Sequence, residues 1–75
     1  MSERMVVRRG SDIGLAIAEA RRSRGLSQQG LAELSGIERT YLARLEAGHS
    51  VVLVERALRT LRRLGAEVVI ELPGP

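Results

Sequence analysis

Four glycines divide this chain into short segments, and that division constrains the fold more than any other feature of the sequence. Each glycine follows a stretch with apolar residues at helical spacing, and glycine is the residue most often found just past the end of a helix. The sequence therefore predicts four short helices. They are expected near residues 11–24, 28–34, 38–47 and 51–64, ended by Gly25, Gly36, Gly48 and Gly65.

Two of these segments carry an apolar stripe at i, i+3, i+4 and i+7, which is the spacing of an amphipathic helix. The stripe of the first segment comprises Ile13, Ala16, Ile17 and Ala20. The stripe of the fourth segment comprises Val54, Ala57, Leu58, Leu61 and Leu64. Ser11 or Asp12 is expected to cap the first helix, and Ser50 the fourth.

The periodicity changes after the last of the four glycines. Apolar and other residues alternate from Ala66 to Leu72, which is the pattern of a β-strand. A strand needs a partner for its backbone groups. The sequence offers two: Met5 to Arg8 of the same chain, or the same strand in a second copy. We expect the second, because pairing two copies about a two-fold axis satisfies both edges at once. The residues expected in that contact are Val68, Ile70 and Leu72.

The chain is too short to form more than one hydrophobic core. Its 75 residues are expected to bury only about 60% of the surface of the unfolded chain. We expect residues 1–10 to form a basic N-terminal arm, residues 11–65 the folded domain, and residues 66–75 a dimerisation strand and tail. The apolar runs are too short to cross a membrane and no signal peptide is visible, so we expect no membrane contact and a cytoplasmic protein.

Ligands for metals and cofactors are scarce. The chain has no Cys and one His, which excludes disulfides and leaves too few ligands for a structural zinc. We therefore expect no metal and no cofactor. Because the sequence also lacks paired His residues and a glycine-rich phosphate loop, we do not expect an enzyme.

The charge of the chain favours an anionic partner. All twelve basic residues are Arg, against nine acidic residues, for a net charge of +3. Arg stays ionised, and its planar fork fits phosphates and guanine edges. A general Arg-for-Lys bias also explains the absence of Lys, but it leaves the excess positive charge unchanged. Nucleic acid is the partner that this balance favours.

The window from residue 26 to 48, LSQQGLAELSGIERTYLARLEAG, has the arrangement of a helix-turn-helix. Ser27 is expected to cap its first helix. Ala32 lies where the two helices cross, which requires a small side chain. Gly36 lies in the turn, where a positive φ is cheap only for glycine. The residues expected to lock the second helix onto the core are Ile37, Leu42 and Leu45.

This pattern resembles the Xre/Cro-type helix-turn-helix family of bacterial and phage repressors. The resemblance covers about Asp12 to Leu64 and rests on Arg22-x-x-Gly-Leu-Ser-Gln, then Leu-Ala, Ser-Gly-Ile and Leu-Glu-Ala-Gly. Gly30 departs from the polar helix former usual in the family. The tail from Arg59 to Pro73 resembles the end of HipB-like antitoxins, where a last helix precedes a strand that pairs across a homodimer. The resemblance implies a mainly α, lambda-repressor-like domain with such a strand.

The resemblance also assigns roles by position. The residues that align with base-reading positions are Arg39, Thr40 and Arg44, and Ala43 lies on the same face, where it permits close approach to the groove. The residues expected at phosphates are Ser27, Gln28, Tyr41 and His49. Tyr41 is the only aromatic residue, and a place on the inward face of its helix is the alternative. Glu46 resembles a family residue that ties helix ends together, and we expect Arg22 as its partner.

Two functional hypotheses follow. The first is a homodimeric repressor that binds double-stranded DNA at a near-palindromic operator, and its narrower version is the autoregulating antitoxin of a HipA-like kinase toxin. The second is an interaction module that binds a partner protein, with DNA binding secondary. Two Arg and a Thr on the outer face of the second helix favour the first.

Overall fold

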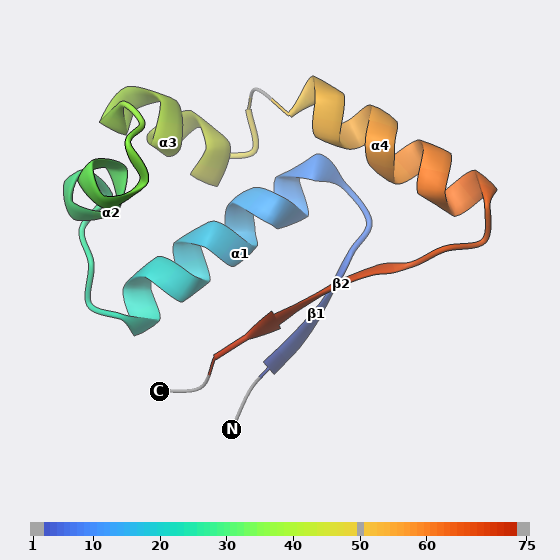
Figure 1. Cartoon of the computed structure of the whole chain (residues 1–75), viewed down its shortest axis with the longest axis horizontal. Coiled ribbons are helices and arrows are strands. Elements are labelled where there is room, and N and C mark those ends of the chain that lie inside the picture. Colours follow the sequence, from blue (N-terminus) through green and yellow to red (C-terminus); the bar gives the residue numbers. More distant parts are fainter. Residues whose placement is uncertain (1–2, 50, 74–75) are drawn as a thin grey trace.

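A computed structural model describes residues 3–49 and 51–73. The elements in chain order are β1 (Glu3–Val7), α1 (Gly10–Ser23), α2 (Gln28–Ser35), α3 (Arg39–Glu46), α4 (Val52–Arg63) and β2 (Val68–Leu72). The expected mainly helical architecture is confirmed, and the two strands lie along one side of the helices (Figure 1). Ser50, which we expected to cap the fourth helix, lies outside the described residues.

The first helix begins earlier than the sequence suggests. Its N-cap is Arg9, so the expectation that Ser11 or Asp12 is the cap was wrong. The Asp12 carboxylate instead accepts hydrogen bonds from the backbone N–H groups of Arg8 and Arg9, at 2.8 and 3.0 Å. These two bonds lower the pKa of Asp12. A carboxylate in the first helical turn also complements the helix dipole, so Asp12 fixes this end of α1 from inside the helix.

The helix-turn-helix segment forms as expected from its caps and its turn. Ser27 caps α2, with its Oγ accepting from the backbone N–H of Gly30 at 2.9 Å. Gly36 ends α2 with a φ of 69°, and the N–H of Ile37 returns to the carbonyl of Ala32 at 3.1 Å. This left-handed turn sends the chain into α3 at an angle to α2.

The two strands pair with each other within the chain. β1 and β2 are antiparallel, with Glu3 opposite Leu72 and Val7 opposite Val68. This corrects the expectation that the C-terminal strand finds its partner only in a second copy. Residues 3–7 have the length and apolar content to satisfy one edge of β2, so this part of the expected basic arm is a strand. Within the described residues the sheet has two strands, which leaves the other edge of β2 open.

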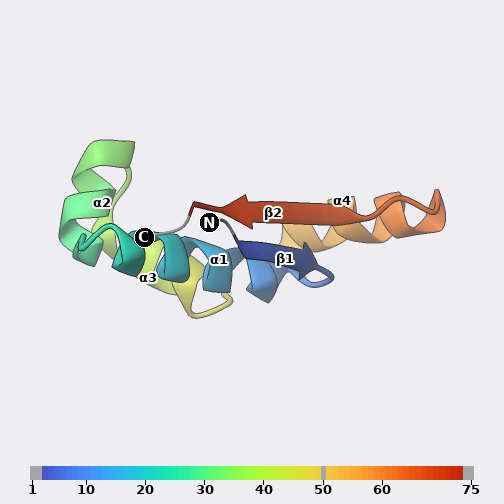
Figure 2. The ribbon, with the colours of Figure 1, turned by 90° about the horizontal axis from the view of Figure 1, so that it is seen from below.

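The core is small. The buried apolar residues are Val7, Ala16, Ala18, Ala32, Leu42 and Leu58. The molecule is a thin slab of 37 × 30 × 17 Å, seen along its edge in Figure 2. The apolar residues predicted to face inward on the fourth helix are only partly covered: Leu58 is buried, whereas Leu61 and Leu64 are exposed. Tyr41 is 47% exposed, so the alternative of an inward position was wrong.

Candidate nucleic-acid interface

The second helix of the helix-turn-helix is fixed from its inner side. Leu42 is 1% exposed and anchors α3 to the core. Gly14 lets α1 cross α3 closely: a Cβ built there would lie 2.0 Å from the backbone oxygen of Leu45. This contact holds the C-terminal half of α3 against a backbone rather than against a flexible side chain. The orientation of α3 is therefore set by a close helix crossing.

The outer side of α3 is free. Arg39, Thr40 and Arg44 are exposed, and Ala43 is half-buried between them. Positions 39, 40, 43 and 44 recur at helical spacing, so these residues share one face of the helix. Four of the residues singled out from the sequence are thus brought together on one accessible surface, with two Arg side chains long enough to reach base edges.

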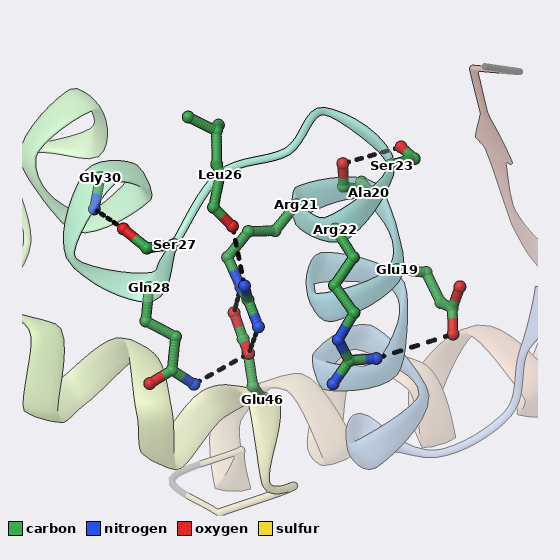
Figure 3. Close-up of polar contacts among 10 residues, drawn as sticks. All are labelled: Glu19, Ala20, Arg21, Arg22, Ser23, Leu26, Ser27, Gln28, Gly30 and Glu46. Atoms are coloured by element: carbon green, nitrogen blue, oxygen red, sulfur yellow. Dashed lines mark hydrogen bonds and ion pairs between the residues drawn. The ribbon is translucent and has the colours of Figure 1, made fainter.

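A charged cluster links α1, α2 and the end of α3. Arg21 donates to the Glu46 carboxylate through Nε at 2.7 Å and through Nη2 at 2.9 Å, and Gln28 donates to the same carboxylate at 3.0 Å (Figure 3). The side chains of Arg21 and Glu46 are 12% and 6% exposed. The hydrogen bonds from Arg21 are the largest cause of the lowered pKa of Glu46. A bidentate pair of this kind fixes both direction and distance.

The partner of Glu46 is one residue away from the one expected. Arg22 instead approaches Glu19 at 3.9 Å, with both side chains 64% exposed. Figure 3 shows Arg21 and Gln28 converging on Glu46 while Arg22 lies apart. The helical register contains the missed signal, because Gly14, Ile17 and Arg21 fall at i, i+3 and i+7 on the side of α1 that meets α3.

The residues expected at phosphates differ in how accessible they are. Ser27 is exposed at the start of α2, and Gln28 is half-buried with its amide N–H on Glu46. Tyr41 is exposed on α3. His49 is exposed in the loop after α3, where it and Arg44 line one shallow hollow. The sequence reasoning missed a contact at the other end of α1, where the N–H of Gly10 donates to Glu55 at 2.5 Å and ties α1 to α4.

Two anchored short helices with an exposed, Arg-bearing second helix define a helix-turn-helix DNA-binding protein. The chain belongs to the Helix-turn-helix family whose model matches residues 17–69, and it is a DNA-binding transcriptional regulator of the Xre type. No curated protein and no solved structure matches the chain. Among the described residues, no helix is long and apolar enough to cross a membrane.

Proposed function

We propose that this regulator is a sequence-specific repressor that binds a near-palindromic operator as a homodimer. The observation that carries the proposal is the α3 face, on which Arg39, Thr40 and Arg44 are exposed while the opposite side of the helix is held by Leu42. A recognition helix needs both properties. Its outer side chains must reach base edges, and its axis must not turn when they do.

The residue types on this face suit the major groove. Arg39 and Arg44 have the bidentate geometry that matches O6 and N7 of guanine. Thr40 and the small Ala43 suit close approach and contact with a thymine methyl group. Ser27, Gln28, Tyr41 and His49 then contact phosphates on either side of the groove, and these contacts position the helix without reading sequence.

The test compares three Arg→Ala variants on a selected operator and on random-sequence DNA. Arg39→Ala and Arg44→Ala are expected to lose about 1–3 kcal/mol on the operator and much less on random DNA. Arg59→Ala, on α4, is the matched control and removes the same charge from another helix. Equal losses on operator and random DNA for the two α3 variants would mean that these residues contact phosphates only.

The homodimer in this proposal uses the open edge of β2. The chain exposes 5490 Å² of surface, whereas a compact monomer of 8.2 kDa exposes roughly 4,500 Å². The excess is comparable to the 800 Å² or so that each partner contributes to a standard protein interface. Pairing β2 with its copy extends the sheet to four strands. Val68, Ile70 and Leu72, which are half-buried in the single chain, then lie at the centre of it.

A single cysteine tests this pairing, because the chain has none of its own. Antiparallel pairing centred on Ile70 sets residue 70 opposite itself, at a Cα separation within disulfide range. Ile70→Cys is therefore expected to cross-link into a dimer on oxidation. Met5→Cys, at the position that pairs with Ile70 on β1, is the control and stays uncross-linked. A monomer in sedimentation at tens of micromolar would contradict the homodimer.

The narrower proposal is that the repressor is the antitoxin of a HipA-like kinase toxin and represses its own operon. The support is the likeness of the tail to HipB-like antitoxins, from the last helix to the C-terminal strand. The simplest observation is the adjacent reading frame, which should encode a kinase-like protein that copurifies with this chain. An adjacent frame without kinase motifs would leave the repressor proposal standing and remove the antitoxin one. The alternative, an interaction module with secondary DNA binding, is favoured by the uncovered apolar face of α4.

A further inference from the structure

The side of α4 that faces away from the core is apolar and uncovered. Leu53 and Leu64 are 79% and 77% exposed, and Leu61 is 36% exposed. Together with the exposed Ala57 they recur at intervals of three and four residues, so they form one stripe along the helix. We call these four residues the α4 stripe. Leucines exposed to this degree along one line are unusual in a small soluble domain and mark an interaction surface.

An apolar hollow opens beside the α4 stripe. It has a volume of about 120 Å³ and lies between α4 and the sheet, lined by Leu58, Leu61, Val6 and Val68 among others. Leu61 belongs to both the hollow and the stripe, so the two surfaces are continuous. A partner can therefore lay a helix along the stripe and place one apolar side chain in the hollow, as an anchor residue does in many protein interfaces.

The charges along the side of the α4 stripe that is turned away from the sheet are positive. Arg56 and Arg63 are exposed along the side of the stripe that is turned away from the sheet. α4 contains a single carboxylate, Glu55, and that side chain accepts from the backbone of Gly10. Within residues 3–49 and 51–73, no Arg of α4 takes part in an ion pair. The rim on this side of the stripe is therefore basic, whereas the hollow on the sheet side is lined by the acidic residue Glu67 as well as by Arg8 and Arg62.

We propose that the α4 stripe docks an acidic amphipathic helix of a partner protein. The partner helix presents apolar residues to Leu53, Leu61 and Leu64, and it carries Asp or Glu residues opposite Arg56 and Arg63. This inference deepens the proposed function, because it names the surface and the chemistry through which the regulator meets a protein partner. It rests on that function in one respect, namely that the regulator has a protein partner other than a second copy of this chain.

Charge also argues against a second copy as the occupant. Two antiparallel α4 helices related by a two-fold axis would bring Arg56 and Arg63 of both copies to the same side of the contact. Four guanidinium groups would then line one rim without a carboxylate, which opposes association. With an acidic partner helix, Arg56 and Arg63 instead face Asp or Glu residues, and the charges on the two sides of the contact are complementary. The open edge of β2, rather than α4, is left for the second copy.

The experiment measures binding of two synthetic helical peptides of about five turns to the full chain. Both peptides carry the same Leu stripe, flanked by Glu in one and by Lys in the other. We expect the Glu peptide to bind and the Lys peptide to bind at least tenfold more weakly. Leu53→Ser and Leu64→Ser should each weaken Glu-peptide binding by about tenfold, and Arg56→Gln and Arg63→Gln by up to about fivefold each. Arg59→Gln, on the opposite side of α4, is the matched control and should change nothing.

Further measurements test whether another occupant covers the α4 stripe, and each of the following results would overturn the proposal. Conversion of a dimer to a monomer by Leu53→Ser with Leu64→Ser, seen in sedimentation, would assign the α4 stripe to a second copy. Binding to vesicles of anionic phospholipid through the same two leucines would assign it to a membrane surface. A loss of operator affinity in Arg56→Gln as large as its loss of Glu-peptide affinity would assign the rim to DNA. Failure of both peptides to bind would also overturn it. Operator affinity of the leucine variants is expected to be unchanged, so failure here stays distinct from failure of the repressor proposal.

Discussion

Replacing Gly14 by Ala tests whether the close crossing of α1 and α3 holds the recognition helix. In most helices this change stabilises, because Gly costs about 0.5–1 kcal/mol relative to Ala. Here the new Cβ would lie 2.0 Å from the backbone oxygen of Leu45, where about 3.3 Å is the usual closest carbon–oxygen approach. That oxygen also accepts from the N–H of Gly48 at 3.0 Å, so it cannot retreat alone. The two helices must separate by more than 1 Å.

Separation of packed helices costs about 1–3 kcal/mol, out of a total stability of about 4–11 kcal/mol expected for a chain of this length. We therefore expect Gly14→Ala to lower the free energy of unfolding by that amount in urea titrations followed by circular dichroism. Gly30→Ala is the matched control. Its Cβ would meet only Ser27 Oγ, at 3.3 Å, and Leu26 Cδ2, at 3.7 Å, so it should be neutral or stabilising by up to about 1 kcal/mol. If Gly14→Ala stabilises as much as Gly30→Ala, the close crossing does not exist in solution.

Three further predictions concern the core, the charged cluster and the DNA contacts. Leu42→Ala should destabilise by about 2–5 kcal/mol, because Leu42 is 1% exposed; a loss under 1 kcal/mol in urea titration would contradict its role as the anchor of α3. The pKa of Glu46 is lowered by Arg21, so its stabilising effect is present at neutral pH and is lost as the pH falls below the ordinary carboxylate range, about pH 4. Glu46→Gln should lower the urea midpoint at pH 7 and flatten its decline in acid, and an unchanged acid decline would mean that other carboxylates control it. Operator affinity should fall with salt at a log–log slope of about −0.9 for each neutralised phosphate, and a flat titration would exclude this mode of binding.

The helices and the helix-turn-helix could be predicted because each rests on local signals. Gly36 requires a left-handed turn, Ser27 is a good cap, and Leu42 falls on the inner side of a short helix whatever the rest of the chain does. These features depend on a few neighbouring residues, so their effect on the backbone is visible in the sequence. The fold class is therefore predictable from the sequence.

Pairings between distant segments were less accessible. The choice between Arg21 and Arg22 as the partner of Glu46 depends on the rotation of α1 about its axis, and a one-residue change turns the helix by about 100°. The pairing of β2 with β1 depends on where two ends of the chain meet. The close approach at Gly14 is a contact with the backbone of another helix, and nothing local to Gly14 distinguishes it from Gly30, whose Cβ would meet only side-chain atoms, at 3.3 and 3.7 Å.

Selection of binding sites from a random duplex library tests the central claim most directly. The chain is expected to enrich an inverted repeat whose half-sites are about 34–36 Å, or 10–10.5 base pairs, apart, with G·C pairs at the positions that Arg39 and Arg44 read. Repeating the selection with Arg44→Ala should relax the preference at one position in each half-site and leave the spacing unchanged. A library that emerges without a common sequence, or with a single half-site that Arg39→Ala and Arg44→Ala leave unchanged, would contradict the assignment of α3 as the recognition helix of a dimeric repressor.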